Sequence, residues 1–330
     1  MNSSTESAQD RGPLVTRQFG LTGATGFVGR VLIPLLESRG AHVRRLVRSH
    51  GRGQAADISK VRTFVTGPLE DAPDLRSALM DVTTLIHLAG RAHVMRETAA
   101  DAIAAYRATN VEGTRNLAEA AADAGVQRLI FISSIKVNGE RTSKQPFRAS
   151  DEPNPEDAYG VSKAEAEAVL QEVSARTGLE ICIIRPPLVY GPGVKGNFAR
   201  LIRAVEKGVP LPLAAIDNAR SMVYVENLCD LIVRCSDHPA AAGRTFLVAD
   251  DEALSTPELL RRIGQARGKP ARLLHVPQPL LKACLTILGR QREYERLADS
   301  LVVDTTSTRE ALDWSPPVSM AEGLRRTVGR

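Results

Sequence analysis

Tyr159 and Lys163 are the pair of side chains in this sequence best suited to proton transfer. They stand four residues apart in a predicted helix over 158–177, so they share one helix face. An ammonium group beside a phenol stabilises the phenolate and lowers the phenol pKa from about 10 toward neutral pH. Such a tyrosine can exchange a proton with a hydroxyl or a carbonyl. Ser133 and Ser134 end the predicted strand that precedes this helix, which distinguishes the pair from an ordinary exposed i,i+4 contact.

A glycine-rich turn near the start of the chain predicts a phosphate site. Residues 22–29 read Thr-Gly-Ala-Thr-Gly-Phe-Val-Gly, between a predicted strand over 15–21 and a predicted helix over 28–38. Glycines allow close approach of a pyrophosphate, and the N–H groups and dipole of the helix start attract its charge. Three glycines alone can serve packing only. Their position between a strand and a helix favours dinucleotide binding.

Strands and helices alternate through the first half of the chain. Because parallel strands need helical crossovers, this order predicts an α/β fold, a Rossmann doubly wound parallel sheet. We expect residues 1–13 to be a disordered tail and 14–187 to form the dinucleotide-binding domain, with return segments near 221–250. Residues 188–220 and 251–330 should form a smaller, interleaved C-terminal lobe that caps the carboxyl ends of the strands and binds the substrate. The predicted strands are 15–21, 41–47, 61–66, 84–90, 127–134 and 179–185, with a late one at 245–249.

The composition limits the classes of partner that this chain is expected to bind. The chain has 330 residues, 43% of them hydrophobic, and a formal net charge of +5 that permits an anionic partner. The 43 basic and 38 acidic residues are interspersed and aromatic residues make up only 4%, so no basic stripe with stacking aromatics indicates nucleic acid. A small phosphate-bearing molecule suits this charge better.

The cysteines and apolar runs indicate a cytoplasmic protein. Cys182, Cys229, Cys235 and Cys284 form no C-x-x-C pair and have no histidine cluster nearby, which predicts reduced, buried thiols and no metal site. The first dozen residues lack the apolar core of a signal peptide, and the apolar run over 280–288 is too short to span a bilayer. We therefore expect no membrane insertion.

Taken together, the motifs resemble the extended short-chain dehydrogenase/reductase family, and within it the nucleotide-sugar epimerase/dehydratase branch. The resemblance runs from residue 22 to the C-terminus. Its motifs are T-G-A-T-G-F-V-G at 22–29, H-L-A-G at 87–90, N-V-E-G-T at 110–114, S-S-I-K-V-N-G at 133–139, Y-G-V-S-K at 159–163, R-P-P-L-V-Y-G-P-G at 185–193, R-S-M-V-Y-V-E-N-L at 220–228 and L-D-W-S-P at 312–316.

This resemblance implies roles for individual residues. Tyr159 is the expected acid/base, Lys163 tunes it and binds the nicotinamide ribose, and Ser134 hydrogen-bonds the reacting oxygen. The expected cofactor contacts are Gly23, Thr25, Gly26, Phe27, Val28, Gly29, Arg48, Leu69, Leu88, Ala89, Gly90, Asn110, Ser133, Tyr159, Lys163 and Pro186. The expected contacts to a nucleotide-sugar substrate are Ser134, Asn197, Arg220 and Arg296. Arg220 suits a diphosphate because its guanidinium is planar and permanently charged. Relatives commonly pair through the helices that here contain Asn110 and Tyr159, which implies a homodimer.

The end of the second strand bears on the choice of coenzyme. NAD enzymes of this fold usually carry an acid there, whereas an arginine suits the 2′-phosphate of NADP. Here Val47 is followed by Arg48, and Arg44 and Arg45 stand just before, so NADP is favoured over NAD; solvated strand arginines are the alternative. Many relatives read Gly-Asp-Leu after the third strand, but this chain reads Gly-Pro-Leu at 67–69 and lacks that aspartate for the adenine.

The residues after the serines separate the candidate reactions. Nucleotide-sugar dehydratases carry an Asp-Glu pair where this chain has Ile135 and Lys136, so dehydration lacks its acid and base. The 133–139 segment and the C-terminal region resemble bacterial UDP-N-acetylquinovosamine dehydrogenases of polysaccharide and O-antigen sugar synthesis. We therefore expect an NAD(P)-dependent oxidoreductase that reduces the 4-keto group of a UDP-linked 6-deoxy-N-acetylhexosamine, with Tyr159 as proton donor. The alternatives are a UDP-sugar 4-epimerase with tightly bound NAD, a non-catalytic NADP-sensing regulator, and a steroid- or flavonoid-type reductase.

Overall fold

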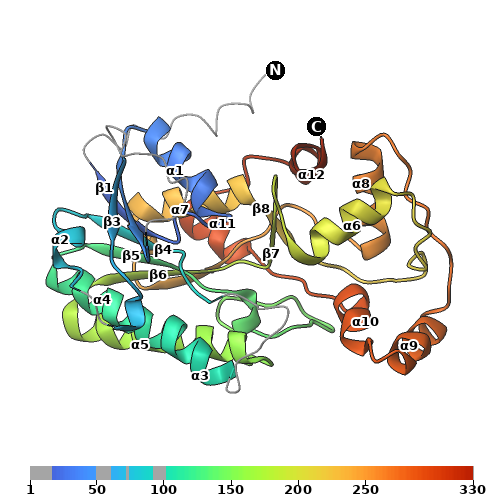
Figure 1. Ribbon diagram of the computed structural model, residues 1–330, viewed down its shortest axis with the longest axis horizontal. Helices are drawn as coiled ribbons and strands as arrows, with labels where there is room; N and C mark the ends of the chain where they lie inside the picture. Colours follow the sequence, from blue (N-terminus) through green and yellow to red (C-terminus); the bar gives the residue numbers. More distant parts are fainter. Residues whose placement is uncertain (1–16, 50–60, 72–73, 92–101, 330) are drawn as a thin grey trace.

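A seven-stranded parallel sheet forms the centre of the molecule (Figure 1). The computed structural model describes residues 17–49, 61–71, 74–91 and 102–329; the predicted tail over 1–13 lies outside these ranges. The strand order is β3-β2-β1-β4-β5-β6-β9, so the direction of winding reverses between β1 and β4, where α/β folds bind ligands. The Rossmann prediction is confirmed. The strands are β1 (Gln18–Thr22), β2 (His42–Val47), β3 (Val61–Val65), β4 (Thr84–His87), β5 (Arg128–Ile132), β6 (Glu180–Arg185) and β9 (Arg244–Leu247).

Helices cover both faces of this sheet, and each face has its own apolar core. Adjacent strand residues point to opposite faces, so Leu85 joins one cluster while Ile86 joins the other. One face is covered by α1 (Gly29–Ser38), α7 (Val225–Asp237) and α11 (Thr306–Leu312), as Figure 1 shows. The other face is covered by α2 (Arg76–Leu79), α3 (Ala102–Arg107), α4 (Gly113–Asp123) and α5 (Ala158–Thr177). Burial on both faces explains why the strands read as continuous apolar runs.

The helical segment that precedes β5 is interrupted. Its described part, from residue 102, consists of α3, a π-helical turn η2 (Ala108–Glu112) and α4. A π turn inserts an extra residue into the helix and often marks a functional site. Here it carries the buried Asn110.

A small second sheet connects the main sheet to the C-terminal lobe. Strand β7 (Leu188–Tyr190) pairs in parallel with β8 (Met222–Tyr224). Three residues after a Pro-Pro pair carry no readable alternation, so the sequence pattern does not reveal β7. The helices of this region are α6 (Gly196–Glu206), α8 (Thr256–Ala266), α9 (Gln278–Ile287), α10 (Gln291–Ala298) and α12 (Met320–Val328).

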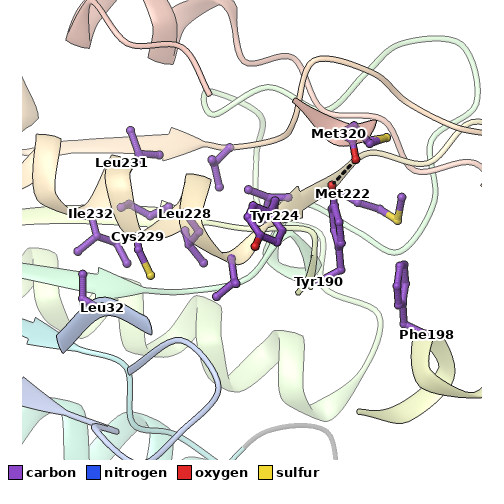
Figure 2. Close-up of a cluster of buried hydrophobic side chains, with 14 of the residues drawn as sticks. Leu32, Tyr190, Phe198, Met222, Tyr224, Leu228, Cys229, Leu231, Ile232 and Met320 are labelled. Atoms are coloured by element: carbon purple, nitrogen blue, oxygen red, sulfur yellow. Dashed lines mark hydrogen bonds between the residues drawn. The ribbon is translucent and has the colours of Figure 1, made fainter. Parts of the chain in front are cut away.

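Aromatic rings form the core beneath the second sheet (Figure 2). Tyr190 stacks on Phe198 with ring centroids 5.5 Å apart and lies tilted to Tyr224 at 5.6 Å. Its hydroxyl donates to Asp250 Oδ2 at 2.6 Å and lies 3.5 Å from the Met320 carbonyl oxygen, the dashed line in Figure 2. A Cβ on Gly323 would lie 2.8 Å from that hydroxyl, so α12 packs here only because residue 323 has no side chain.

Three of the four cysteines are buried, and the fourth is not. Cys182, Cys229 and Cys235 lie in the core, whereas Cys284 is exposed on α9, so the prediction of four buried thiols is wrong at that position. The reason is that α9 lies on the surface and buries only Leu281. Within the described ranges, no helix combines the length and the apolar run that crossing a bilayer requires.

Candidate functional site

A cavity of about 860 Å³ opens at the carboxyl ends of β1, β2 and β4. The glycine turn forms its floor with unusually close backbone packing. Gly23 has φ of +69°, and a Cβ there would lie 2.7 Å from the Ala89 nitrogen. A Cβ on Gly29 would lie 2.5 Å from the Gly23 carbonyl oxygen, and the first turn of α1 carries no acidic residue. The turn therefore fits the diphosphate of a dinucleotide. The predicted cofactor residues that line the cavity are Gly23, Thr25, Gly26, Arg48, Leu69, Leu88, Ala89 and Gly90.

Other predicted cofactor residues shape the site from behind. Phe27 and Val28 are half-buried and pack against the core, and Gly29 is buried under the turn. The Pro186 carbonyl accepts a hydrogen bond from the Ile135 nitrogen at 3.0 Å. That bond holds the 3-10 turn η3 (Ile135–Val137), which follows Ser134, against the end of β6.

Asn110 ties one wall of the cavity to helix α5. Its side-chain oxygen accepts from the Arg91 nitrogen at 2.7 Å, and its amide nitrogen donates to Ser162 Oγ at 2.9 Å and to the Arg91 carbonyl at 3.1 Å. The same oxygen lies 3.1 Å from where a Cβ of Gly90 would be. Asn110 therefore sets the position of residues 88–90, and the π turn is what directs it there.

A buried hydrogen-bond chain joins the ends of β1 and β4. The Ala89 nitrogen donates to Thr22 Oγ1 at 3.2 Å, and Thr22 Oγ1 lies 2.6 Å from His87 Nδ1. His87 Nε2 lies 3.0 Å from Thr114 Oγ1, which donates to the Asn110 carbonyl at 2.6 Å. This pattern assigns the proton of a neutral imidazole to Nε2. Burial, with Lys163 nearby, lowers the His87 pKa to about 3, so the ring stays neutral.

The sequence analysis did not predict this chain of hydrogen bonds. His87 and Thr114 do lie in the motifs at 87–90 and 110–114, which was the available signal.

Tyr159 and Ser134 lie near each other at the start of helix α5. The Asp157 side chain accepts from the Gly160 nitrogen at 2.7 Å and thereby caps the helix, which places Tyr159 in its first turn. The Ser134 side chain lies near the Tyr159 hydroxyl and acts on its pKa. Ser134 itself caps η3 and accepts from the Lys136 nitrogen at 3.3 Å. A hydroxyl pair is thus presented at the end of β5.

The Lys163 ammonium contacts a backbone carbonyl and an aromatic ring, whereas the sequence analysis expected it to act on the Tyr159 phenol. Its ammonium donates to the Ile132 carbonyl at 2.7 Å and lies 3.8 Å from the centre of the Phe131 ring. Burial lowers the Lys163 pKa to about 7, although the Glu167 carboxylate opposes this shift.

The predicted lowering of the Tyr159 pKa is not found. Burial raises the pKa of Tyr159 to about 12, and the Asp157 carboxylate adds to the shift. The neighbouring Ser134 hydroxyl lowers the Tyr159 pKa but is the smaller effect. The reason is that the phenol is removed from water while the Lys163 ammonium is directed at a backbone carbonyl.

A buried ion pair lies one helical turn beyond Lys163 on α5. Arg185 and Glu167 form a bidentate pair with Nη2–Oε2 at 2.6 Å and Nε–Oε1 at 3.0 Å, and both side chains are buried. Arg185 Nη1 also donates to Asn138 Oδ1 at 3.0 Å. The Ser133 hydroxyl donates to Glu167, so it faces this pair. The predicted site residues that do not line the cavity include Asn110, Ser133, Ser134, Tyr159, Lys163 and Pro186. Sequence reasoning missed Glu167, although it follows Lys163 by four residues on the same helix.

Basic residues lie at the far end of the cavity. Arg45, Arg48 and Ser49 line it together with Gly67 and Glu70. Arg44 does not line it: its guanidinium is buried against the Met80 carbonyl, and burial lowers its pKa. The positive charge expected near a ribose phosphate therefore comes from two arginines and not three.

The predicted substrate residues of the C-terminal lobe do not line this cavity. Arg220 is half-buried, bridges to Leu254 and Leu301 through its backbone, and donates from Nη1 to the Asp299 carbonyl at 2.8 Å. Burial lowers its pKa. Asn197 is exposed in the first turn of α6, and Arg296 is exposed on α10. The structure thus brings Ser134 to Tyr159 and leaves Asn197, Arg220 and Arg296 apart from this pair.

Comparison with known proteins places this fold and site in one family. A sequence model of the NAD dependent epimerase/dehydratase family matches residues 20–249. A UDP-glucose 4-epimerase of Vibrio cholerae is 43% identical over 310 residues, covering 93% of each chain. A UDP-glucose 4-epimerase of Mycolicibacterium smegmatis is 32% identical, covering 93% of this chain and 96% of the relative.

A solved structure shares the fold. UDP-glucuronic acid 4-epimerase from Bacillus cereus, in complex with NAD, superposes with a TM-score of 0.75 at 21% identity, over 94% of this chain and 97% of the other. The resemblance drawn from the sequence motifs is therefore confirmed, and this protein belongs to the NAD dependent epimerase/dehydratase family.

Proposed function

We propose that this protein is a UDP-sugar 4-epimerase that retains NAD. The observation that carries the proposal is the Ser134–Tyr159 hydroxyl pair at the end of β5, with Lys163 one turn further along α5, beside a glycine turn that fits a diphosphate. The 43% identity to a UDP-glucose 4-epimerase favours this alternative over the 4-keto reductase that the sequence analysis put first.

One group of residues would hold the coenzyme, and another would transfer the proton. The backbone around Gly23 and Gly26 would hold the coenzyme diphosphate, and the wall at 88–90 would lie against the coenzyme. NAD, when bound, supplies the hydride acceptor and donor for C4 of the sugar. Tyr159 would take the proton of the C4 hydroxyl and later return it to the C4 oxygen. Ser134 would hydrogen-bond that oxygen throughout.

The proton balance depends on the charge of Lys163. With its pKa raised to about 12, Tyr159 carries its proton at neutral pH and must lose it before it can act as a base. Lys163 has a pKa lowered to about 7, so its charge changes in the range where the enzyme would work. A protonated Lys163 one turn away favours the phenolate.

A second candidate is a reductase of a 4-keto UDP-sugar, in which NADPH gives the hydride to C4 and Tyr159 gives the proton to the oxygen. Arg45, Arg48 and Ser49 at the cavity end support it, because this set suits a 2′-phosphate. The dehydratase remains disfavoured, since Lys136 is paired with Glu140 at 2.7 Å and with Asp157 at 2.5 Å. A sensing regulator is disfavoured because it would have no use for Ser134, Tyr159 and Lys163 together.

One set of assays tests the proposal. Purified protein is denatured and the released nucleotides are identified by chromatography, and untreated protein is incubated with UDP-glucose or UDP-N-acetylglucosamine without added coenzyme. We expect bound NAD and formation of the C4 epimer. Protein that releases no NAD, leaves both sugars unchanged and oxidises NADPH only with a UDP-4-keto sugar would replace the epimerase with the reductase.

We also propose a homodimer formed through α4 and α5. Three ion pairs bridge neighbouring helices on this side of the sheet: Arg115–Glu172 at 3.1 Å, Arg176–Glu119 at 2.8 Å and Arg107–Glu165 at 2.5 Å. They hold α3 and α4 against α5 and so preform the surface. Light scattering after size exclusion should give twice the 35.6 kDa chain mass; a chain-sized mass at micromolar concentration would exclude this dimer.

A further inference from the structure

Helix α9 presents an apolar face to solvent. Leu280, Ile287 and Leu288 are 55%, 84% and 66% exposed, whereas Leu281, at the edge of this group, is buried. At 100° per residue, Leu280, Cys284, Ile287 and Leu288 form one continuous strip. Figure 1 shows α9 at the far end of the C-terminal lobe, opposite the end that holds α2 and β3. A strip of this kind on a monomer surface marks an interaction site.

The segment that carries this strip has an excess of basic residues. From Leu259 to Arg292 the sequence contains no aspartate or glutamate. The basic residues of this segment are Arg261, Arg262, Arg267, Lys269, Arg272, Lys282, Arg290 and Arg292. Four of these arginines pair with glutamates from outside the segment: Arg261 with Glu258, Arg262 with Glu252 and Glu258, Arg267 with Glu206, and Arg290 with Glu293. Lys282 lies on α9 itself and Arg272 precedes it, so the segment keeps a basic excess.

We propose that α9 docks the protein on an anionic phospholipid bilayer. A short helix with an exposed apolar face and basic flanks lies in the plane of the headgroups, with its apolar side chains at the acyl boundary. Ten residues are too few to span a bilayer, so the docking is peripheral.

A second copy of the chain is the rival occupant of this strip. Pairing two α9 faces would bring their basic flanks together, and like charges oppose such contact. An anionic surface has the complementary charge.

The docking surface and the catalytic site are separate. No residue of α9 lines the cavity at the ends of β1 and β4. A bound membrane would therefore position the enzyme at a lipid surface without entering the reaction, and the inference stands or falls independently of the proposed epimerase activity.

Vesicle co-sedimentation of the full chain, without substrate, tests the proposal. Vesicles of phosphatidylcholine alone are compared with vesicles containing about 30% phosphatidylglycerol, at about 0.05 M and about 0.5 M salt. We expect binding to the anionic vesicles at low salt and at least about tenfold weaker binding at high salt or without phosphatidylglycerol. The variant I287E/L288E should lose at least about tenfold in vesicle affinity.

Matched controls separate docking from misfolding. Met80, 57% exposed at the opposite end of the molecule, is changed to glutamate and should bind vesicles like the parent. Thermal melting and coenzyme content of I287E/L288E should match the parent. Absence of binding to anionic vesicles, equal binding by I287E/L288E, or equal binding to both vesicle types would overturn the proposal. So would a parent oligomer that I287E/L288E converts to monomer, because the strip would then serve self-association.

Discussion

The glycine cradle over residues 22–29 and the C-terminal lobe are held together in different ways. In the cradle, backbone packs against backbone: a Cβ on Gly29 would lie 2.5 Å from the Gly23 oxygen. In the lobe, a Cβ on Gly323 would meet the side chains of Tyr190 and Tyr224. An added methyl group therefore meets backbone in the first region and side chains in the second.

The largest expected effect is the loss of turnover when the Tyr159 hydroxyl is removed. Tyr159→Phe removes the proton-exchanging hydroxyl, so turnover should fall by about 10³-fold while bound coenzyme and melting temperature stay unchanged. Steady-state kinetics measure turnover, and nucleotide release measures the bound coenzyme. Tyr106→Phe is the matched control, since that ring lies 6.0 Å from Tyr159. Retained turnover in Tyr159→Phe would remove the tyrosine from the mechanism.

The next effect concerns the buried ion pair between Glu167 and Arg185. Glu167→Leu leaves the buried Arg185 guanidinium without its partner and should cost about 3–5 kcal/mol of unfolding free energy, measured by urea titration. The double variant E167L/R185M should recover most of that loss, because no unpaired charge remains. Recovered stability with reduced kcat would show that the pair also positions Ser134; losses that simply add would argue against a coupled pair.

A pair of alanine substitutions compares the two regions directly. Gly29→Ala forces a methyl group against the backbone of Gly23 and Ala24, which has no room to move, and should cost about 2–3 kcal/mol and release the coenzyme. Gly323→Ala meets the Tyr190 and Tyr224 side chains and should cost about 1–2 kcal/mol with coenzyme retained. Chemical denaturation and nucleotide content of both variants test this contrast, which fails if both variants lose the coenzyme equally.

The smallest effect is a pH dependence of stability that originates at Lys163. Burial lowers its folded-state pKa to about 7, below the unfolded value near 10.5, so between these values the unfolded chain binds more protons. Stability should therefore rise from pH 7 to pH 8.5, by roughly 1.5 kcal/mol from this residue. Lys163→Met should flatten that rise in urea titrations at the two pH values. An unchanged slope in the variant would place the titration elsewhere.

Sequence reasoning reached the parts of the molecule that local patterns determine. The glycine turn and the parallel strands follow from short periodic segments, and α5 has the predicted bounds of 158 and 177. The meeting of Ser134 with Tyr159 follows from where β5 ends and α5 begins. These features depend on neighbours in the chain.

The remainder depends on contacts between segments that no single-sequence pattern connects. The Glu167–Arg185 pair, the Asn110–Ser162 bond and the β7–β8 sheet each join separate elements. The pKa of Tyr159 was predicted in the wrong direction because burial, which outweighs the neighbouring ammonium, is a property of the folded chain.

The position of β9 at the edge of the sheet has a consequence for biosynthesis. β9 pairs with β6, yet β7, α6, β8 and α7 are translated between the two. While the ribosome makes those residues, the outer edge of β6 has no strand partner and offers its backbone groups to any passing polypeptide. Nascent chains stalled before residue 244 should therefore be the species that chaperones hold, and release should coincide with the arrival of the last strand.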